Sequence, residues 1–293
     1  MSLTSLLSIA RNAMMAHERA VGTVGHNIAN AETPGYTRQR LMLQTAQPES
    51  YPPYGQIGRG VEILGFERMR SSFLDDSWRR EASVGSQYST LQQVLEQASG
   101  VLAEPGEAGL SASLDAMIDA FNTLAANPTD PAARAVAMAN LRALTDKFHS
   151  IDARLEGIAQ NIGAEATQLV ARANSLIREI SELNSLIQAA GGNAPDLADR
   201  RDLAIDQLGE IVDVRVIDRG RGSVDVTVAG IQVVASGGGL QQLSLSGTGP
   251  YSLQLGDPPS PVTPAAGKLR GLFDAFAEIG TRGTSTARAT GLR

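Results

Sequence analysis

The segment from 132 to 194 constrains this chain most, because it contains no proline. Apolar residues recur in it at steps of three and four, which is typical of a helix with one apolar stripe, and only Glu165 and Arg172 interrupt the stripe. An unbroken helix here would be about 90 Å long, which predicts an elongated molecule. The stripe consists of Leu141, Leu144, Phe148, Ile151, Leu155, Ile158, Ile162, Leu169, Leu176, Ile180, Leu183 and Ile187.

Glycine pairs and prolines indicate where the helices stop. Gly191 and Gly192 are expected to end the long helix, and the alternative is two or three shorter helices broken near Gly157 and Gly163. Two further helices are predicted upstream, over 84–102 and 110–124, with Glu104-Pro105-Gly106 ending the first. Asp130 and Pro131 match an N-cap followed by proline at the first helical position.

After residue 196 the apolar period changes from helical to alternating. A short helix is predicted over 197–211, followed by strands at 212–216, 224–228 and 231–233, and by two more at 240–246 and 251–255. The predicted fold is mainly α, an elongated coiled-coil-like bundle with a small antiparallel β region over about 212–255. The expected domains are an N-terminal assembly helix and turn (1–34), an elongated helical bundle (35–211), a small β subdomain (212–265), and a short helix start with a disordered tail (266–293).

The first thirty residues carry a second heptad stripe, with one polar member, His17. Its other positions are small and weakly charged, including Ser5, Ala13, Ala16 and Ala20. Such a helix could be an ordinary core helix. The alternative, favoured because nothing upstream can cover it, is a seam that packs against helices of other chains. The seam consists of Leu3, Leu7, Ala10, Met14, His17, Val21, Val24 and Ile28.

A specific turn follows this seam. Pro34 and Gly35 match the two central positions of a type II turn, whose second position needs a positive φ. Asn27 and Asn30 are expected to bond the backbone as the helix ends. The alternation over 36–43 predicts a short extended segment.

Two motifs together give a resemblance to a known family. The seam and turn resemble the N-terminal signature of bacterial flagellar axial proteins, carried here by Ala29, Asn30, Thr33, Pro34, Gly35, Tyr36 and Arg38. A second motif, with Asp196, Leu197, Asp199, Arg201 and Asp202 before two Val-Asp-Val strands, resembles the hook-associated protein 1 family more than hook or rod proteins. The resemblance covers residues 1–236 and continues more weakly over 265–276.

The resemblance implies a structural component of the bacterial flagellum that forms the hook–filament junction by helix-mediated self-assembly, in support of motility. It implies self-association into a ring, contacts with hook protein and the filament-side junction protein, and an extracellular location. It also implies export through the flagellar apparatus without a cleaved signal peptide, helped by a chaperone that binds a C-terminal region. Since members of this family are much longer, the chain is expected to be a truncated or frame-shifted member.

No catalytic constellation is visible in the sequence. His17 and His26 are nine residues apart, His149 has no nucleophile pattern nearby, and "GQIGRG" at 55–60 does not link a strand to a helix. The carboxylates over 196–202 are better explained by helix capping and ion pairing than by acid–base chemistry. We therefore predict no catalytic, cofactor-binding or metal-binding residues, no cofactor and no enzyme. The alternatives are another axial protein of the hook or rod type and a rod-associated cell-wall hydrolase.

The composition agrees with a structural protein. With a net charge of −6 and no long apolar run, the chain is expected to bind no nucleic acid and to insert into no membrane. The absence of cysteine excludes disulfides, thiolate metal sites and cysteine nucleophiles.

Overall fold

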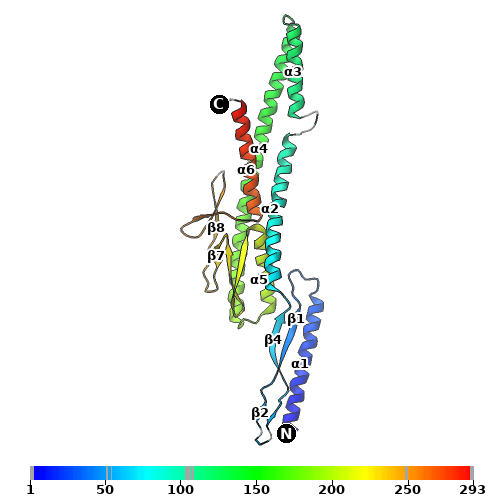
Figure 1. The fold of residues 1–293 in the computed structure, drawn as a ribbon, viewed down its shortest axis with the longest axis vertical. Helices are drawn as coiled ribbons and strands as arrows, with labels where there is room; N and C mark the ends of the chain where they lie inside the picture. The colour runs from blue at the N-terminus through cyan, green and yellow to red at the C-terminus, as the bar shows by residue number, and fades with distance from the viewer. Residues whose placement is uncertain are drawn as a thin grey trace. The chain divides into compact units, whose positions relative to one another are not determined.

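A computed structural model describes residues 3–50, 52–53, 55–102, 106, 109–247 and 250–290, with side chains described up to 280 (Figure 1). Six helices and short antiparallel sheets make up these residues, so the prediction of a mainly α fold with a small β region is confirmed. The chain divides into two compact units. Unit 1 contains Met1–Glu81, Asn174–Gly209 and Val214–Gln242, and unit 2 contains Ala82–Ala173, Glu210–Asp213 and Leu243–Arg293.

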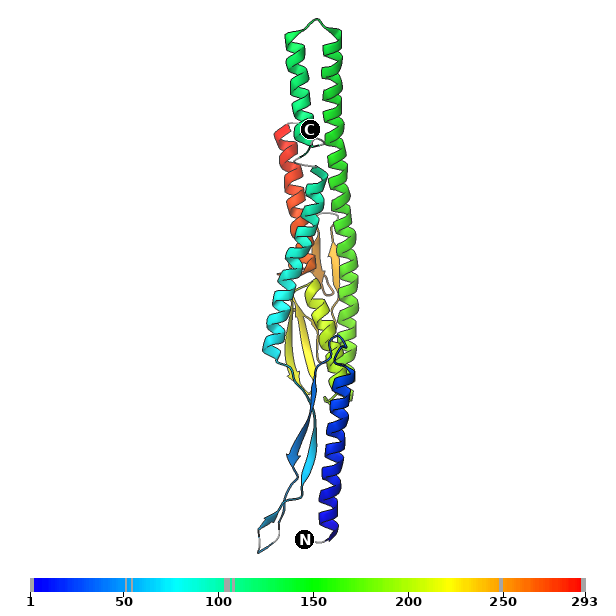
Figure 2. The same ribbon diagram turned by 90° about the vertical axis from the view of Figure 1, so that its right-hand side faces the viewer.

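The N-terminal part of unit 1 is a helix lying along a β-hairpin. Helix α1 (Leu3–Ala29) runs beside the antiparallel strands β1 (Gln39–Thr45) and β4 (Val61–Arg68), as both views show (Figures 1 and 2). The hairpin tip carries the two-residue strands β2 (Glu49–Ser50) and β3 (Gln56–Ile57). The sequence predicted the first strand as an extended segment within a helical domain but missed its partner, β4. Gly65 interrupts the alternation of that strand at a register shift opposite Met42 and Leu43.

The remainder of unit 1 packs a three-stranded sheet with two helices. Helix α5 (Pro195–Ile211) precedes β5 (Val214–Gly220), β6 (Ser223–Val228) and β7 (Ile231–Val234), and β6 is the central strand. These elements match the predicted helix and three strands. The central strand is buried on both faces, with Val226 and Val228 fully inaccessible to solvent. Helix α2 (Ser72–Leu102) begins in this unit.

Helix α4 (Pro131–Ala189) is continuous over 59 residues and supplies residues to both units. The predicted caps are confirmed. Asp130 Oδ1 accepts a hydrogen bond from Ala132 N at 2.8 Å, and at the C-terminus Gly192 N and Gly191 N donate to the carbonyls of residues 187 and 188. The breaks considered near Gly157 and Gly163 do not occur, since one helix runs through both positions.

Unit 2 contains α3 (Leu110–Ala126), a second three-stranded sheet of β8 (Leu243–Ser246), β9 (Ser252–Leu255) and β10 (Ser260–Val262), and α6 (Lys268–Thr290). The predicted single β region over 212–255 is therefore two sheets, one in each unit. Strand β10 was not predicted, because its proline is tolerated only at an edge position, which it occupies beside β9. Leu253, Leu269 and Leu272 are fully buried in the core of this unit.

The C-terminal segment differs from its prediction. The backbone of α6 is helical through residue 290, where disorder was expected from 280 onward. Extending a formed helix adds one hydrogen bond for each residue fixed, so the segment needs no apolar period of its own once α6 has nucleated at its buried end. Residues 291–293, and the predicted helix terminator at Glu104 and Pro105, lie outside the described residues.

Candidate assembly surface

All eight seam residues of α1 are exposed, and the helix packs on its own chain with a different face. The exposed fraction is 87% for Leu3, and Ala10 and His17 are also exposed. It is more than half for the other five seam residues, which are Leu7, Met14, Val21, Val24 and Ile28. The buried residues of α1 are Ala16 and Thr23. The predicted seam is thus an apolar stripe that this chain leaves uncovered.

Small side chains explain why the other face packs inward. Ala16 and Thr23 allow the helix to lie close to β1 and β4, and the buried hydroxyl of Thr23 donates to the carbonyl of Arg19 at 2.8 Å. Gly60 also permits a close approach, because a Cβ there would meet Ile9 Cγ2 at 3.1 Å. The sequence predicted only the first strand of the hairpin that receives this face, so the small residues of α1 had no predicted packing surface.

The predicted type II turn is confirmed at the end of α1. Tyr36 N donates to Thr33 O at 3.1 Å, and Gly35 has φ +79°. A Cβ at Gly35 would also meet Leu203 Cβ at 3.1 Å, so α5 passes close to the turn. Asn30 bonds the local backbone as predicted, through its Nδ2 to His26 O at 3.1 Å.

Asn27 joins α1 to β1. Its Nδ2 donates to Gln39 O at 2.9 Å, and its Oδ1 accepts from Gln39 N at 2.9 Å and from the Tyr36 hydroxyl at 2.7 Å. One amide side chain therefore satisfies both backbone groups of the first strand residue and fixes the direction in which the chain leaves the turn.

The two family motifs, 160 residues apart in sequence, meet in unit 1. Asp196 Oδ1 accepts from Gln39 Nε2 at 2.6 Å and lies 3.4 Å from His26 Nε2. Asp199 Oδ2 accepts from Thr37 N at 3.0 Å. The N-terminal turns of α5 therefore hold the turn that follows α1, which sequence reasoning did not anticipate.

The carboxylates of α5 pair with arginines far away in sequence. Arg68 Nη1 donates to Asp202 at 2.6 Å and to Asp199 at 3.0 Å, and Arg79 Nε donates to Asp206 at 2.6 Å. Burial lowers the pKa of Arg68, but Asp202 and Asp199 more than offset this and raise it above its ordinary value. The sequence predicted ion pairs for the acids over 196–202, and Arg201 Nε lies 3.8 Å from Asp202 Oδ1 on the same helix. The arginines on β4 and α2 were not predicted as partners. The spacing of the acids by three and four residues places them on one helix face, which was the available signal for a partner on another element.

The remaining motif residues differ in burial and in the hydrogen bonds that they form. Arg201 donates to Asn184 Oδ1 at 3.0 Å and to the carbonyl of Gly222, and burial lowers its pKa. Leu197 is half-buried, whereas Ala29 and Arg38 are exposed. The carbonyl of Arg38 accepts from Met69 N at 2.9 Å.

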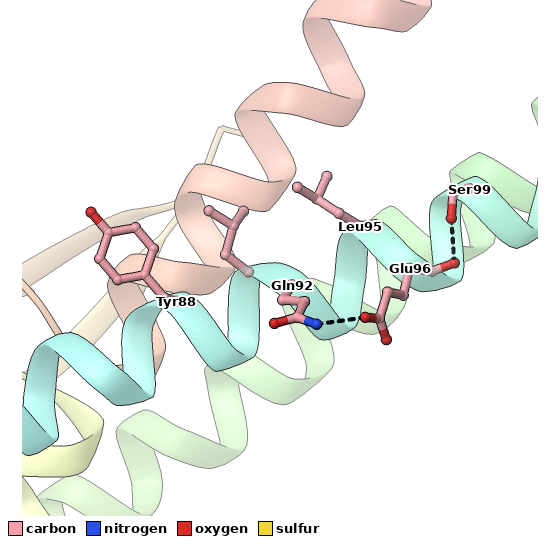
Figure 3. Close-up of a pocket in the computed structure, with 6 residues that line it drawn as sticks. Tyr88, Gln92, Leu95, Glu96 and Ser99 are labelled. Atoms are coloured by element: carbon pink, nitrogen blue, oxygen red, sulfur yellow. Dashed lines mark hydrogen bonds between the residues drawn. The ribbon is translucent and has the colours of Figure 1, made fainter.

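A groove in unit 2 runs along α2. The groove has a volume of about 480 Å³. Two hydrogen bonds of its polar groups stay within the helix, from Gln92 Nε2 to Glu96 Oε1 at 2.7 Å and from the Ser99 hydroxyl to Glu96 O at 2.9 Å (Figure 3). In the part of the chain that the structure describes, no group of three or more His, Asp or Glu side chains could hold a metal ion. No described helix is long and apolar enough to cross a bilayer. The residues that line the groove along α2 are Tyr88, Leu91, Gln92, Leu95, Glu96 and Ser99.

Two protein-family models match parts of this chain. Residues 95–286, more than half of the chain, match the family model described as the flagellar hook-associated protein FlgK helical domain. The chain belongs to the FlgK family of flagellar hook-associated proteins. Residues 7–37, which contain most of the seam and the turn, match the flagella basal body rod protein family.

Individual FlgK-family relatives cover most of this chain. Flagellar hook-associated protein 1 of Bacillus subtilis is 33% identical over 72% of the chain and 43% of that protein, and its counterpart in Salmonella typhimurium is 29% identical over 83% and 44%. The chain spans less than half the length of these curated relatives. The structure of the flagellar hook junction protein FlgK from Burkholderia pseudomallei has the same fold over 70% of this chain and 39% of that one, with a TM-score of 0.61 at 23% identity.

Proposed function

We propose that this chain is a structural subunit of the hook–filament junction of the bacterial flagellum, and that the exposed α1 seam is its assembly surface. The observation that carries the proposal is that α1 packs on its own hairpin with small residues and leaves its large apolar residues in water. Each fully buried Leu, Met or Val contributes about 1.5–3 kcal/mol, so covering this stripe with other axial helices provides a strong driving force.

The finer parts of the proposal rest on family membership. Copies associate into a ring, and the seam also contacts hook protein and the filament-side junction protein. The chain reaches this extracellular position through the flagellar export apparatus, with a chaperone and without a cleaved signal peptide. It acts as a scaffold and not as an enzyme. The match over 95–286 supports a hook-associated protein over a hook or rod protein, since the rod family model matches only the N-terminal segment.

Binding to isolated hooks tests the proposal. The variant Leu7→Gln/Met14→Gln/Val21→Gln changes three seam residues that are 71–74% exposed, so it keeps the far-UV circular dichroism of the original chain. We expect the original chain to co-sediment with purified hook particles, and the triple variant to bind at least about tenfold more weakly. The matched control, Glu18→Gln, changes an exposed residue beside the seam and should bind normally. Equal binding by all three proteins, or failure of the original chain to bind, would refute the seam as the assembly surface.

A further inference from the structure

The N-terminal arm, which we define as α1, the turn and the hairpin over residues 3–70, adds very little to the apolar core of unit 1. Among the arm residues that the structure describes, Ala16 is the only apolar one that is buried, and α1 packs on the arm's own hairpin. The core of the unit comes instead from the last turns of α4, from α5 and from the sheet, where Ile180, Ile205 and Val226 are fully inaccessible to solvent. This core therefore owes its apolar contacts to residues outside the arm.

Polar contacts join the arm to α5. The acceptors are aspartates that recur at steps of three and four along α5, so they lie on one face of the helix. The donors are one backbone N–H and three side chains of the arm, and their distances to the carboxylate oxygens run from 2.6 to 3.4 Å. The acceptors are Asp196, Asp199, Asp202 and Asp206, and the donors are Thr37 N, Gln39 Nε2, Arg68 Nη1 and Arg70 Nη2.

A cavity of about 180 Å³ lies between the arm and the core of unit 1. Its lining includes Phe66 and Arg68 from the arm, and Ala198, Arg201 and Val224 from the core elements. Protein interiors contain few voids larger than a water molecule, so the arm is packed on the core less tightly than the core is packed on itself.

The charged groups of this contact are largely withdrawn from water. The side chains of Asp199 and Asp202 are 6% and 10% exposed, and that of Arg70 is 19% exposed. Removing charges from water offsets much of their attraction, so such pairs add little net stability, although their geometry still specifies one arrangement. The contact between the arm and α5 is therefore specific in direction and weak in free energy.

We propose that this contact is an ionic joint, which holds the arm in one direction against α5 and opens as a separate step while the apolar core of unit 1 stays folded. Because the arm carries the α1 seam, the joint sets the direction of the seam, and opening of the joint lets that direction change. What this means for assembly rests on the proposed function. The joint itself is a property of the single chain, and its test needs no hook particle.

Two spin labels measure the direction of the arm, because the chain has no cysteine of its own. Glu62→Cys places one label on β4 and Glu182→Cys places the other on α4, both at exposed positions of unit 1. In this background, Asp202→Asn keeps the shape of the side chain and removes the charge that faces two arginines of the arm. Double electron–electron resonance should give one narrow distance distribution in the labelled parent, and a broad or second distribution in the variant.

Hydrogen exchange measures whether the core stays folded. Asp202→Asn should speed amide exchange at least about tenfold over residues 36–45 and 61–70, and leave exchange in β6 within about twofold of the parent. Arg68→Gln removes the charge from the arm side and should give the same pattern. The matched control, Glu18→Gln, removes an exposed charge of the arm away from α5 and should change neither measurement.

Three results would overturn the proposal. A broad distance distribution in the labelled parent would mean that the contact does not fix the direction of the arm. Unchanged distances in Asp202→Asn would mean that the ion pairs do not hold it. An equal rise of exchange in the arm and in β6 would mean that the arm and the core unfold together.

Discussion

At the scale of single residues, the most specific contacts surround the turn after α1. Asn27 makes three hydrogen bonds, two to the backbone of Gln39 and one to the Tyr36 hydroxyl. Any residue without a side-chain amide leaves the two backbone groups of Gln39 without these partners, and Gln39 is only 6% exposed.

Asn27→Ala should therefore loosen the start of the hairpin. We expect the free energy of exchange-competent opening over residues 36–45 to fall by about 2–3 kcal/mol, measured by hydrogen–deuterium exchange, since each lost bond contributes about 1 kcal/mol. Asn122→Ala, at an exposed position of α3, serves as the control and should change protection by less than about 0.5 kcal/mol. Unchanged hydrogen exchange in Asn27→Ala would show that the turn is stable without the hydrogen bonds of the Asn27 side chain.

A second residue-scale prediction concerns Asp225 on the central strand β6. This carboxylate is 3% exposed and accepts from Arg219 Nε at 2.6 Å and from Ser236 N at 2.7 Å. Burial raises the pKa of Asp225, but the bonds from Arg219 and Ser236 outweigh it, and the net pKa lies below its ordinary value. The ionised form is thus stabilised by folding, and this stability is present above the unfolded pKa and is lost as pH falls through the folded pKa.

Asp225→Asn should lower the urea midpoint of unfolding at pH 7, because Arg219 and Ser236 N lose a charged acceptor. The difference in urea midpoint between the variant and the original chain should shrink as the pH falls below about 4, where an aspartate in the unfolded chain becomes protonated. Parallel titrations of both proteins between pH 7 and pH 2.5 measure this. Asp119→Asn, at an exposed site, should follow the original chain throughout, and a difference that stays constant with pH would contradict the assigned role.

These residues show what sequence can predict at this scale. The type II turn at Pro34 and Gly35 was predictable, because only local backbone preferences decide it. The contacts of Asp196 and Asp199 with the turn were not, since nothing local specifies which element carries the partner. The spacing of Asp199, Asp202 and Asp206 places them on one helix face, but it does not specify that the arginines that meet them lie on β4 and α2.

At the scale of elements, helical periodicity was the reliable signal. It predicted the continuous α4 and the apolar stripe of α1, because a long apolar stripe without proline has few other solutions. The caps of α4 were predicted from local residue types, Asp130-Pro131 and Gly191-Gly192. Strand pairing was predicted less well. β4 begins at Val61, sixteen positions after β1 ends at Thr45, and it contains a glycine, so its alternation was too weak to identify alone.

Two glycines of α4 give a matched test at this scale. A Cβ at Gly157 would have no neighbour within 4 Å, so Gly157→Ala should stabilise the helix by up to about 1 kcal/mol. A Cβ at Gly163 would meet the hydroxyl and, at 2.6 Å, the Cζ of Tyr251, whose ring stacks edge-on against Phe276. Gly163→Ala should therefore destabilise the chain by about 1–3 kcal/mol. Thermal unfolding of the two variants measures whether the melting temperature rises for Gly157→Ala and falls for Gly163→Ala. An equal rise for both would mean that alanine at 163 changes only the helix propensity, and that the close approach of Tyr251 does not require a glycine there.

At the scale of the whole molecule, each unit is built from segments far apart in sequence and has its own buried core. Predicted boundaries at 34, 211 and 265 follow changes of local pattern, whereas the observed units collect residues from three segments each. Val226 is fully buried in unit 1 and Leu272 in unit 2. A core defect should therefore act first within the unit that contains it, because cooperative opening follows the contacts that a residue makes.

Reciprocal substitutions test this partition. Leu272→Ala should cost about 2–5 kcal/mol and reduce hydrogen-exchange protection mainly in α6 and β9, whereas protection in β5 and β6 stays near its original level. Val226→Ala should produce the reverse pattern, with the loss concentrated in the sheet of unit 1. Because α4 contributes to both cores, its first part should respond to the change at Leu272 and its last turns to the change at Val226. If either variant lowers protection uniformly along the chain, the two units open as one, and the stability of the α1 hairpin would then depend on every core residue of the molecule.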